Sequence, residues 1–451
     1  MTTSTPAAHP GTGPDDRRFL RRITIATAWG EGLDGFDLGI ISVVIGTIGT
    51  DLRISSWMLG LIGASSLIGI FIGGPIFGYL TDRFGRRRLF TFNIALFIAA
   101  GIAQMFVFDS ISLFIVRLIL GIAIGAEYAI GAPMLAEFCP AASRGKRLSL
   151  LEVCWYAGFL ISVILGYILV AAHLDWRWIL GTSVIPAILT FILRYGLPES
   201  PRWLMSRGRT EEARRIVEKH FGAGYFNTED FAGEAQVRKG LTQLFAKKYR
   251  GRTIFVCVFW ACLVAPYFAI FTFAPVVLDS LHLSDARAAT ISENGVALIG
   301  VVVGLFLIEK IGRRQMLISP FWIQAAALLI LGIWTSAPVW IVVAAFAVYS
   351  FFNAFSGNLT AVYPAEIFDT EVRTSGVGLA SAASRVGAAA GTWLLPVGLD
   401  HWGVGPCMLI AAAMCVIGAV ISQFMAPETT GRSLTDVARG RSLAEPSRAG
   451  V

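Results

Sequence analysis

The sequence predicts an all-α membrane protein whose twelve transmembrane helices form two related six-helix bundles. Three observations lead to this prediction. Of the 451 residues, 55% are hydrophobic and only 15% are charged, apolar segments of about 20 residues recur along the chain, and a Gly-Arg-Arg loop occurs in both halves. With a mean hydropathy of +0.67, the chain has too little polar surface for a soluble globule of this length.

Each apolar segment is long enough to cross a hydrocarbon core about 30 Å thick, and short polar connections separate the segments. Helices are expected throughout, because a continuous span must satisfy all its backbone polar groups internally. The predicted spans are 23–49, 56–81, 89–108, 111–136, 148–171, 178–195, 253–278, 288–308, 315–334, 339–363, 374–397 and 404–425.

A polar segment in the middle of the chain divides the spans six and six. Within it, the stretch from Thr210 to Lys219 has the charge pattern of a surface helix around a thin apolar stripe. The predicted organisation is a tail over 1–22, a bundle over 23–195, a cytoplasmic linker with short helices over 196–252, a second bundle over 253–425 and a tail over 426–451.

Positive charge is distributed unequally between the loops on the two sides of the predicted membrane. Four arginines precede the first span, and three or four basic residues follow spans 2, 4 and 8. The opposite loops hold only Arg53, Arg177 and Arg287. The positive-inside rule therefore predicts that both termini are cytoplasmic, in a multi-pass protein of the inner or plasma membrane. The net charge of +7 follows this sidedness, so we expect no nucleic-acid partner.

Charged motifs stand at the ends of several spans. They are Gly78 to Arg88 with a weaker copy at Glu309 to Arg314, Arg117 to Gly121, Ala136 to Pro140 with Arg144-Gly145, Pro198 to Leu204, Tyr363 to Glu366 with Glu371 to Arg373, and Pro427 to Arg432. As a set they resemble the signatures of the major facilitator superfamily, in particular its sugar porter and metabolite or aromatic-acid/proton symporter branches. The resemblance implies the major facilitator fold and a secondary active transporter that works by alternating access, and not an enzyme.

The charged residues of these motifs are expected to form contacts between helix ends, where they also complement the helix dipoles. In the family, such contacts hold the cytoplasmic side closed in one state and release it in the other. The resemblance therefore implies a gating role for Asp82, Arg83, Arg86, Glu137, Arg144, Glu199, Arg202, Glu309, Arg313, Glu366 and Arg373.

Few ionisable side chains lie inside the spans, where a charge costs several kcal/mol unless it is paired or faces a watered cavity. Asp34 and Asp37 share one face of span 1, and burial and like charge both favour binding of a proton by one of them. Asp34-Gly35-Phe36-Asp37 also resembles a motif of aromatic-acid/proton symporters in which both acids matter for transport. With Glu127 of span 4 they are the predicted proton-coupling residues, and contact with neighbouring helices is the alternative role.

Arg385 lies among small residues in span 11, and a similar arginine occurs in span 11 of organic-acid symporters. A guanidinium binds a carboxylate through two parallel hydrogen bonds, so Arg385 favours an anionic substrate. A permanent ion pair with Glu127 or with an acid of span 1 is the alternative, and Arg117 is expected to be structural. Further predicted substrate contacts are Trp155, Tyr156, Tyr267, Phe271, Asn294, Asn353 and Asn358.

The predicted function is proton-coupled symport of a small organic anion, such as an aromatic or sugar acid. A sugar or polyol porter is the alternative, although span 7 lacks the glutamine-rich string of sugar porters and Glu152 stands where they commonly have a glutamine. A drug or cation exporter, a sodium-coupled carrier and a transport-dead sensor remain open. Glu127 departs from the aromatic-acid pattern and could also accept a hydroxyl group.

We expect no cofactor and no metal site. The six cysteines show no metal-ligand spacing and are interpreted as packing residues, and no motif of an intramembrane enzyme occurs. The expected partners are a small-molecule substrate, a proton and the lipid bilayer, and the protein is expected to be a monomer.

Overall fold

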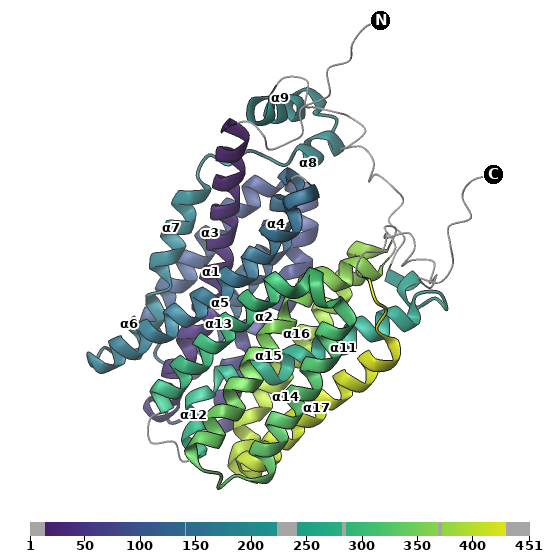
Figure 1. The fold of residues 1–451 in the computed structure, drawn as a ribbon. Coiled ribbons are helices and arrows are strands. Elements are labelled where there is room, and N and C mark those ends of the chain that lie inside the picture. Colours follow the sequence, from purple (N-terminus) through teal and green to yellow (C-terminus); the bar gives the residue numbers. More distant parts are fainter. Residues whose placement is uncertain (1–13, 140, 223–240, 282–285, 369–371, 430–451) are drawn as a thin grey trace, which may run out of the picture.

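The computed structural model describes residues 14–139, 141–222, 241–281, 286–368 and 372–429, and every regular element in these ranges is a helix (Figure 1). The first bundle contains α1 (Pro14–Asp51), α2 (Ser56–Phe84), α3 (Arg86–Ala103), η1 (Gln104–Phe106), α4 (Ser110–Phe138), α5 (Ala141–Ala171), α6 (Trp176–Gly181) and α7 (Val184–Arg194). The second contains α11 (Arg250–Thr272), α12 (Ala274–Ser280), α13 (Ala286–Ile311), α14 (Arg313–Ile333), α15 (Val339–Ile367), α16 (Arg373–Trp402) and α17 (Val404–Met425).

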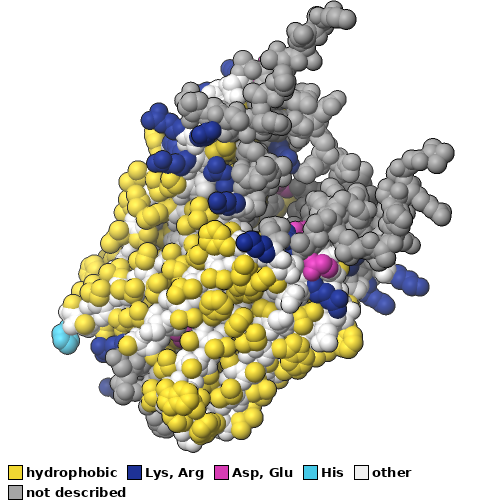
Figure 2. All heavy atoms as spheres, in the orientation of Figure 1, with side chains coloured by type: hydrophobic (Ala, Val, Ile, Leu, Met, Phe, Trp, Pro, Cys, Tyr) yellow, Lys and Arg dark blue, Asp and Glu magenta, His cyan; other side chains and the backbone are white. Residues whose placement is uncertain are grey.

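The predicted fold class is confirmed. Within the described residues, 11 helical stretches are long and apolar enough to cross a membrane. The long helix α16 adds the remaining span. Its many Ser and Gly residues, together with Arg385, leave it without a stretch as apolar as those of the 11. Figure 2 shows hydrophobic side chains covering the flank of the molecule, with lysines and arginines gathered toward the end where α1 begins.

Several helix boundaries differ from the predicted spans for local reasons. Helix α1 begins at Pro14 instead of residue 23, because its basic residues continue the helix beyond the apolar segment. The seventh span divides at Phe273 into α11 and α12. Pro275, in the first turn of α12, has no backbone N–H to donate to the preceding turn, which ends the helix there.

The linker contributes α8 (Pro201–Ser206), α9 (Thr210–Phe221) and η2 (Leu241–Phe245). Helix α9 matches the helical charge pattern of the sequence, and its His220 ring stacks on Phe19 of α1 at 3.9 Å between ring centroids. We call the end of the bundles at which α8 and α9 lie the linker end, and the opposite end the far end. The last turn of α17 also lies at the linker end (Figure 1).

The two halves repeat the same helix start at the linker end. Gly85 before α3 and Gly312 before α14 have φ values of +94° and +90°, which residues other than glycine rarely adopt. Glu199 accepts hydrogen bonds from the backbone N–H groups of Arg86 at 2.9 Å and of Arg87. Glu428 does the same for the N–H groups that begin α14. In each half, a glutamate that follows the last span therefore binds the N-terminus of the third span, where the helix dipole is positive.

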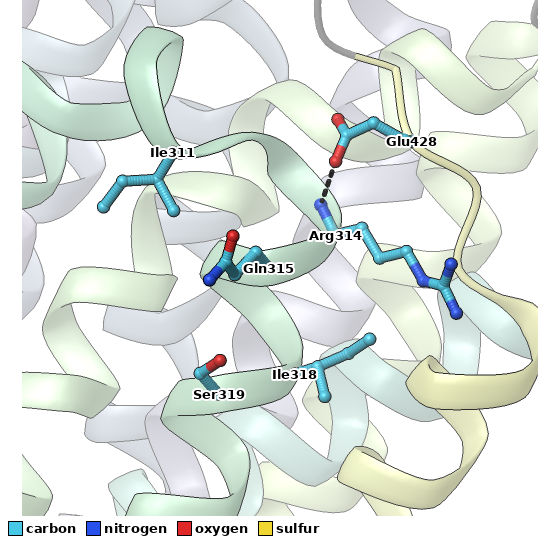
Figure 3. A pocket seen from close by; sticks show the side chains of 6 residues that line it. All are labelled: Ile311, Arg314, Gln315, Ile318, Ser319 and Glu428. Atoms are coloured by element: carbon cyan, nitrogen blue, oxygen red, sulfur yellow. Dashed lines mark hydrogen bonds between the residues drawn. The ribbon is translucent and has the colours of Figure 1, made fainter. Parts of the chain in front are cut away.

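Figure 3 shows the contact in the second half. The Glu428 carboxylate accepts from the Arg314 backbone N–H at 3.2 Å. It also accepts from the Arg313 backbone N–H at 3.1 Å. A cavity of about 380 Å³ opens beside it, lined also by Ile311, Gln315, Ile318 and Ser319. The cavity lies at the linker-end edge of α13 and α14, and its lining contains none of the buried charges of the spans.

The halves meet along α2 with α16 and along α5 with α13. Toward the far end, the rings of Trp57 and Trp393 lie 4.6 Å apart, and a Cβ at Gly60 would lie only 2.0 Å from the Trp393 carbonyl oxygen. Helices α2 and α16 are therefore in direct backbone contact at the far end, where no space remains between the two halves along this seam.

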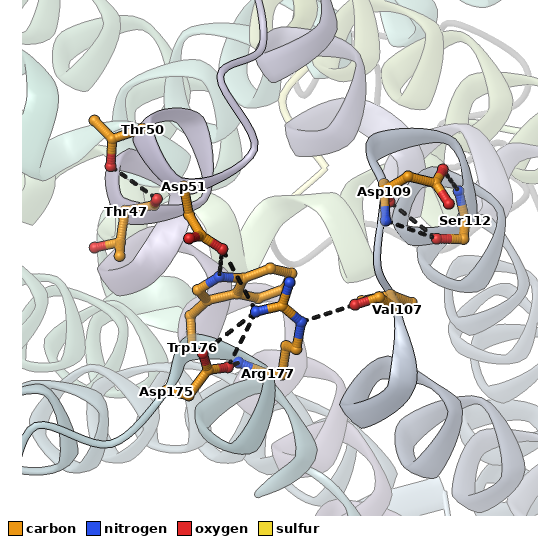
Figure 4. Close-up of polar contacts among 9 residues, drawn as sticks. All are labelled: Thr47, Thr50, Asp51, Val107, Asp109, Ser112, Asp175, Trp176 and Arg177. Atoms are coloured by element: carbon orange, nitrogen blue, oxygen red, sulfur yellow. Dashed lines mark hydrogen bonds and ion pairs between the residues drawn. The ribbon is translucent and has the colours of Figure 1, made fainter.

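Polar contacts tie the far end of the first bundle together (Figure 4). Arg177 Nε donates to the Val107 carbonyl oxygen at 2.7 Å, and its guanidinium pairs with Asp51 at 3.4 Å and with Asp175 at 3.3 Å. Trp176 Nε1 also donates to Asp51, at 2.9 Å. All these groups belong to the same half, so they hold the bundle together without joining it to the second bundle.

Replacing Arg177 with glutamine is expected to lower stability without stopping transport. The variant loses a charge-assisted hydrogen bond to Val107, which corresponds to about 1 to 3 kcal/mol. Thermal unfolding in detergent measures the loss, with Arg287→Gln, an exposed arginine at the same end, as the matched control. Equal melting temperatures for the two variants would contradict the structural role of Arg177.

Candidate functional site

Three carboxyl groups of α1 are buried inside the first bundle. Glu31, Asp34 and Asp37 are spaced three residues apart, which places them along one side of the helix, and each is less than one-tenth exposed. A glycine between them brings α5 against α1, since a Cβ at Gly35 would lie 2.0 Å from the Trp155 carbonyl oxygen. The carboxyl groups therefore face a closely packed protein interior instead of lipid.

Asp37 forms a fully buried ion pair with Arg117 of α4. Their charged atoms are 3.5 Å apart and neither side chain is exposed. Arg117 also donates to Gln104 Oε1 and to Ser66 Oγ, each at 3.1 Å. The other carboxylate oxygen of Asp37 makes no hydrogen bond of normal geometry with a described residue, and the Ser183 hydroxyl interacts with the carboxyl group. Arg117 is thus a fixed partner for one of the two predicted proton-binding acids.

Asp34 has a different environment, although it lies one turn from Asp37. It is 1% exposed, and within the described part of the chain its Oδ2 atom has no hydrogen-bond partner and its carboxylate no ion pair. The charges that act on it most strongly include Glu127, Glu31 and Arg194. A carboxyl group without a fixed cation can take up or release a proton without leaving a partner unpaired.

Glu127 of α4 pairs with Arg194, in the last turn of α7. Both guanidinium Nη atoms donate to the carboxylate, one of them at 2.8 Å, and both side chains are buried. The Arg194 guanidinium also lies 3.7 Å from the centre of the Phe90 ring, and Asn93 donates to Glu127 Oε2 at 3.5 Å. Arg194 Nε also donates to the Ala26 carbonyl oxygen at 3.4 Å, so helices α1, α3, α4 and α7 all contact the pair.

Two buried charges of the site were not predicted from the sequence. Arg194 stands at the predicted end of span 6, where an arginine is usually a boundary residue, and Glu293 of α13 is 3% exposed. Counting every charged residue within two turns of a predicted span end would have found both. No sequence signal pairs Arg194 with Glu127, because they are 67 residues apart.

Aromatic side chains from both halves meet at the middle of the molecule. We call Trp155 and Tyr156 of α5, with Tyr267, Phe268 and Phe271 of α11, the aromatic cluster. The Tyr267 ring lies 6.2 Å from that of Trp155, 6.0 Å from that of Tyr156 and 4.2 Å from that of Phe271. Four predicted substrate contacts are thus brought together at the interface between the halves.

Arg385 of α16 extends this cluster. Its guanidinium lies 5.3 Å from the centre of the Tyr128 ring of the first half and 5.6 Å from that of Phe268. Trp155 Nε1 donates to the Tyr128 hydroxyl at 3.1 Å, which fixes that ring. Arg385 makes no ion pair with any described residue, and the alternative pairing with Glu127 is not found because Arg194 occupies that carboxylate.

The three asparagines predicted to contact substrate donate to main-chain or amide oxygens in this structure. Asn294 donates to the Thr290 carbonyl at 2.8 Å, within its own helix. Asn353 donates to the Leu263 carbonyl at 3.1 Å and to Gln324. Asn358 donates to the Val301 carbonyl, also at 3.1 Å. None of these contacts is with Arg385 or the aromatic cluster, and those of Asn353 and Asn358 join helices of the second half.

At the linker end of the first half, the predicted gating residues make contacts within that half and with α8. Arg86 pairs with Glu137 at 2.7 Å, and the Ser200 hydroxyl donates to the same carboxylate. Trp203 Nε1 donates to the Asp82 carbonyl oxygen at 3.0 Å. Arg83 lies against Phe84, Glu199 caps α3, and Arg202 has further contacts in this region.

The second half has a matching arrangement. Arg313 pairs with Glu366 at 3.2 Å, and Thr429 Oγ1 donates to the same carboxylate at 2.5 Å. The Tyr363 hydroxyl donates to the Pro427 carbonyl oxygen. All of these gating contacts, in both halves, stay within one half and its flanking segment. The side chains of Arg144, Glu309 and Arg373 lie outside the described residues.

Replacing Glu127 alone with glutamine is expected to destabilise the protein strongly, because the Arg194 charge would remain buried without its counter-ion. Breaking a buried ion pair in this way costs about 3 to 5 kcal/mol. The double variant Glu127→Gln/Arg194→Gln removes both charges and is expected to recover most of the loss. Thermal unfolding of the three proteins tests this, and a stable Glu127→Gln protein would contradict the pairing.

The chain matches a family model described as sugar (and other) transporter over residues 23–440. The putative metabolite transport protein YaaU of Escherichia coli is 36% identical over 94% of this chain and 96% of its own length. The inward open structure of the xylose transporter XylE from E. coli matches with a TM-score of 0.80 and 25% identity, covering 94% of this chain and 100% of XylE. A second XylE structure, of a major facilitator superfamily proton:xylose symporter bound to 6-bromo-6-deoxy-D-glucose, matches with a TM-score of 0.76 and 25% identity, covering 94% and 99%.

Proposed function

Because the chain belongs to the sugar (and other) transporter family of the major facilitator superfamily, we propose that it carries a small organic anion together with a proton by alternating access. Membership of this family makes it a multi-pass membrane transporter and not an enzyme. The proposal adds the chemical class of the substrate and the coupling ion. Aromatic acids, sugar acids and similar metabolites carry the required carboxylate.

The observation that carries the anion proposal is the position of Arg385. It is a cation at the middle of a span, between Tyr128 of one half and Phe268 of the other. A charge at this depth is expensive unless it has a function or a partner, and within the described residues no carboxylate pairs with it. A substrate carboxylate would supply that partner through two parallel hydrogen bonds.

Proton coupling is supported by the acids of α1. Asp34 is buried without a fixed cation, whereas Asp37 is held by Arg117. Protonation would neutralise the Asp34 carboxylate. This would reduce the electrostatic repulsion between α1 and an anion bound at Arg385. Coupling then follows if proton and anion together favour the closed, substrate-bound state more than either does alone.

We further propose that the linker end is cytoplasmic and that the structure is inward-facing. The positive-inside distribution supports the orientation. The close contact of Trp57 and Gly60 with Trp393 at the far end supports closure on the outside. The charged motifs of the linker end would gate by exchanging their present contacts within each half for contacts between halves.

A sugar or polyol remains the second candidate substrate. It is favoured by the family description and by the likeness to XylE. Arg385, a cation that makes no ion pair with any described residue, is the reason to prefer an acid. Drug or cation export is less well supported, since Arg385 would repel a cationic ligand.

Purified protein reconstituted in liposomes tests the proposal. External pH is recorded while pools of aromatic acids, sugar acids and neutral sugars are added one at a time. External alkalinisation with an acid pool is expected, because protons enter with the anion. Uptake of neutral sugars alone would transfer the assignment to a sugar porter, and acid uptake without a pH change would exclude proton symport.

A further inference from the structure

Glu293 is a buried acid in the second half that the proposed mechanism does not use. It lies on α13 and is 3% exposed, in contact with α15 through the Ser350 hydroxyl, which donates to Glu293 Oε1 at 3.1 Å. The other carboxylate oxygen has no hydrogen-bond partner among the described residues, and no ion pair of Glu293 occurs among them. A buried carboxyl group with an open acceptor atom is costly unless a ligand completes it.

Two tyrosine hydroxyl groups lie near this carboxyl group. Tyr349 is the neighbour along α15 of Ser350, whose hydroxyl donates to Glu293. Asn353, one turn further on, donates to the Leu263 carbonyl oxygen, which brings α11 and its Tyr267 beside α15. Tyr349 is fully buried, and its hydroxyl makes no hydrogen bond in the part of the chain that the structure describes. Tyr267 is 3% exposed, and its hydroxyl interacts with that of Tyr156 outside normal hydrogen-bonding geometry. Glu293 and Tyr349 therefore have unused hydrogen-bonding capacity on neighbouring helices, and the Tyr267 hydroxyl, whose one interaction is with Tyr156, keeps capacity for a second.

This group of residues adjoins the aromatic cluster. Tyr267 is itself a member of the cluster, and the next residue, Phe268, contacts the Arg385 guanidinium. Tyr156 of the first half approaches α15 as well, since a Cβ at Gly357 would lie 3.5 Å from its hydroxyl oxygen. A molecule bound at Arg385 could thus extend along α11 toward Glu293.

We propose that Glu293, Tyr267 and Tyr349 form a hydroxyl-binding subsite, so that the substrate is a polyhydroxylated carboxylate. The inference rests on the proposed organic-anion transport and adds the chemistry of the far part of the anion. Arg385 holds the carboxylate. The open oxygen of Glu293 accepts a hydrogen bond from a hydroxyl group of the substrate, and the tyrosine hydroxyl groups donate to or accept from neighbouring ones.

The combination of groups favours this ligand. A carboxylate next to two phenol hydroxyls provides both acceptors and donors, which matches alcohol groups, each of them donor and acceptor. A simple aromatic acid would leave these groups unpaired, and sites built to bind a hydroxyl group discriminate strongly against analogues that lack it. The subsite therefore selects among acids that Arg385 alone would treat alike.

Competition between two aldonates in proteoliposomes tests the inference. The probes are D-gluconate and 6-deoxy-D-gluconate, which share the carboxylate and differ by the hydroxyl group farthest from it. The wild type is expected to bind gluconate about tenfold more tightly or better, as a hydrogen bond to a charged group implies. In Glu293→Gln and Tyr349→Phe this ratio is expected to fall toward one, with the affinity for the deoxy acid unchanged.

Arg385→Ala serves as the contrasting variant, because it should weaken both aldonates equally and preserve their ratio. A wild-type protein that does not distinguish the two acids, or variants at Glu293 and Tyr349 that both keep the discrimination, would overturn the subsite while leaving anion transport intact. Transport of neither aldonate, with uptake of neutral hexoses, would overturn the proposed function itself. Tyr349→Phe removes a single oxygen atom, so it keeps the test valid if Glu293→Gln folds poorly.

Discussion

Proteoliposomes that contain Arg385→Ala are expected to lose accumulation of the organic anion, although the protein stays folded. The guanidinium makes no ion pair with any described residue, so its removal breaks no direct salt bridge. A substrate carboxylate, in contrast, would lose a charge-assisted contact. Such losses correspond to about 2 to 5 kcal/mol, or about 30-fold or more in apparent affinity.

Arg385→Lys is the matched control for this experiment. Lysine keeps the positive charge but cannot form the planar fork with two parallel hydrogen bonds, so its affinity for the acid should fall between those of the wild type and the alanine variant. Uptake is measured with the acid that gives alkalinisation with the wild type, and thermal unfolding verifies the fold of each variant. Wild-type affinity in Arg385→Ala would exclude Arg385 as the carboxylate-binding group.

The outcome would also separate two interpretations of the aromatic cluster. Its rings lie 4.2 to 6.2 Å apart around Tyr267, a spacing that suits aromatic packing as well as ligand binding. If Arg385 binds the anion, the cluster forms the wall of the site. If it does not, the cluster is the packed interface between the halves, and the site lies elsewhere along it.

The fold could be predicted from the sequence because a bilayer imposes a fixed length and an internal hydrogen-bond pattern on every span. The charged loops before α3 and α14 also identified the two halves, since Gly85 and Gly312 repeat with the arginines that follow them. The exact helix ends could not be predicted. Pro14 begins α1 well before the apolar segment, and hydropathy contains no signal for that extension.

The site was only partly predictable, for a physical reason. Hydropathy reveals which charges are buried, as for Asp34, Asp37 and Glu127, but not which cation each one meets. The partners Arg117 and Arg194 lie 80 and 67 residues away along the chain. Their pairing depends on how the helices cross, and a single sequence does not encode that visibly. Arg117 could therefore be expected to be structural, but its specific partner, Asp37, is known only from the structure.

Asp34→Asn is expected to abolish proton-driven accumulation while exchange of the anion across the membrane continues. Asp34 is buried without a fixed cation among the described residues, so asparagine removes the proton site and orphans no partner. One proton carried with one monovalent anion supports accumulation of about tenfold per pH unit across the membrane. The variant should equilibrate the anion instead, with no external alkalinisation and with near-normal counterflow.

Asp37→Asn provides the contrast that distinguishes coupling from stability. It leaves the fully buried Arg117 charge without its carboxylate, which should lower the melting temperature as well as transport. Asp34→Asn should change coupling alone. Persistent alkalinisation with Asp34→Asn would instead assign the transported proton to another acid of α1, with Glu31 as the next candidate, since it is also buried and within range of Glu127, Glu152, Arg194 and Arg385.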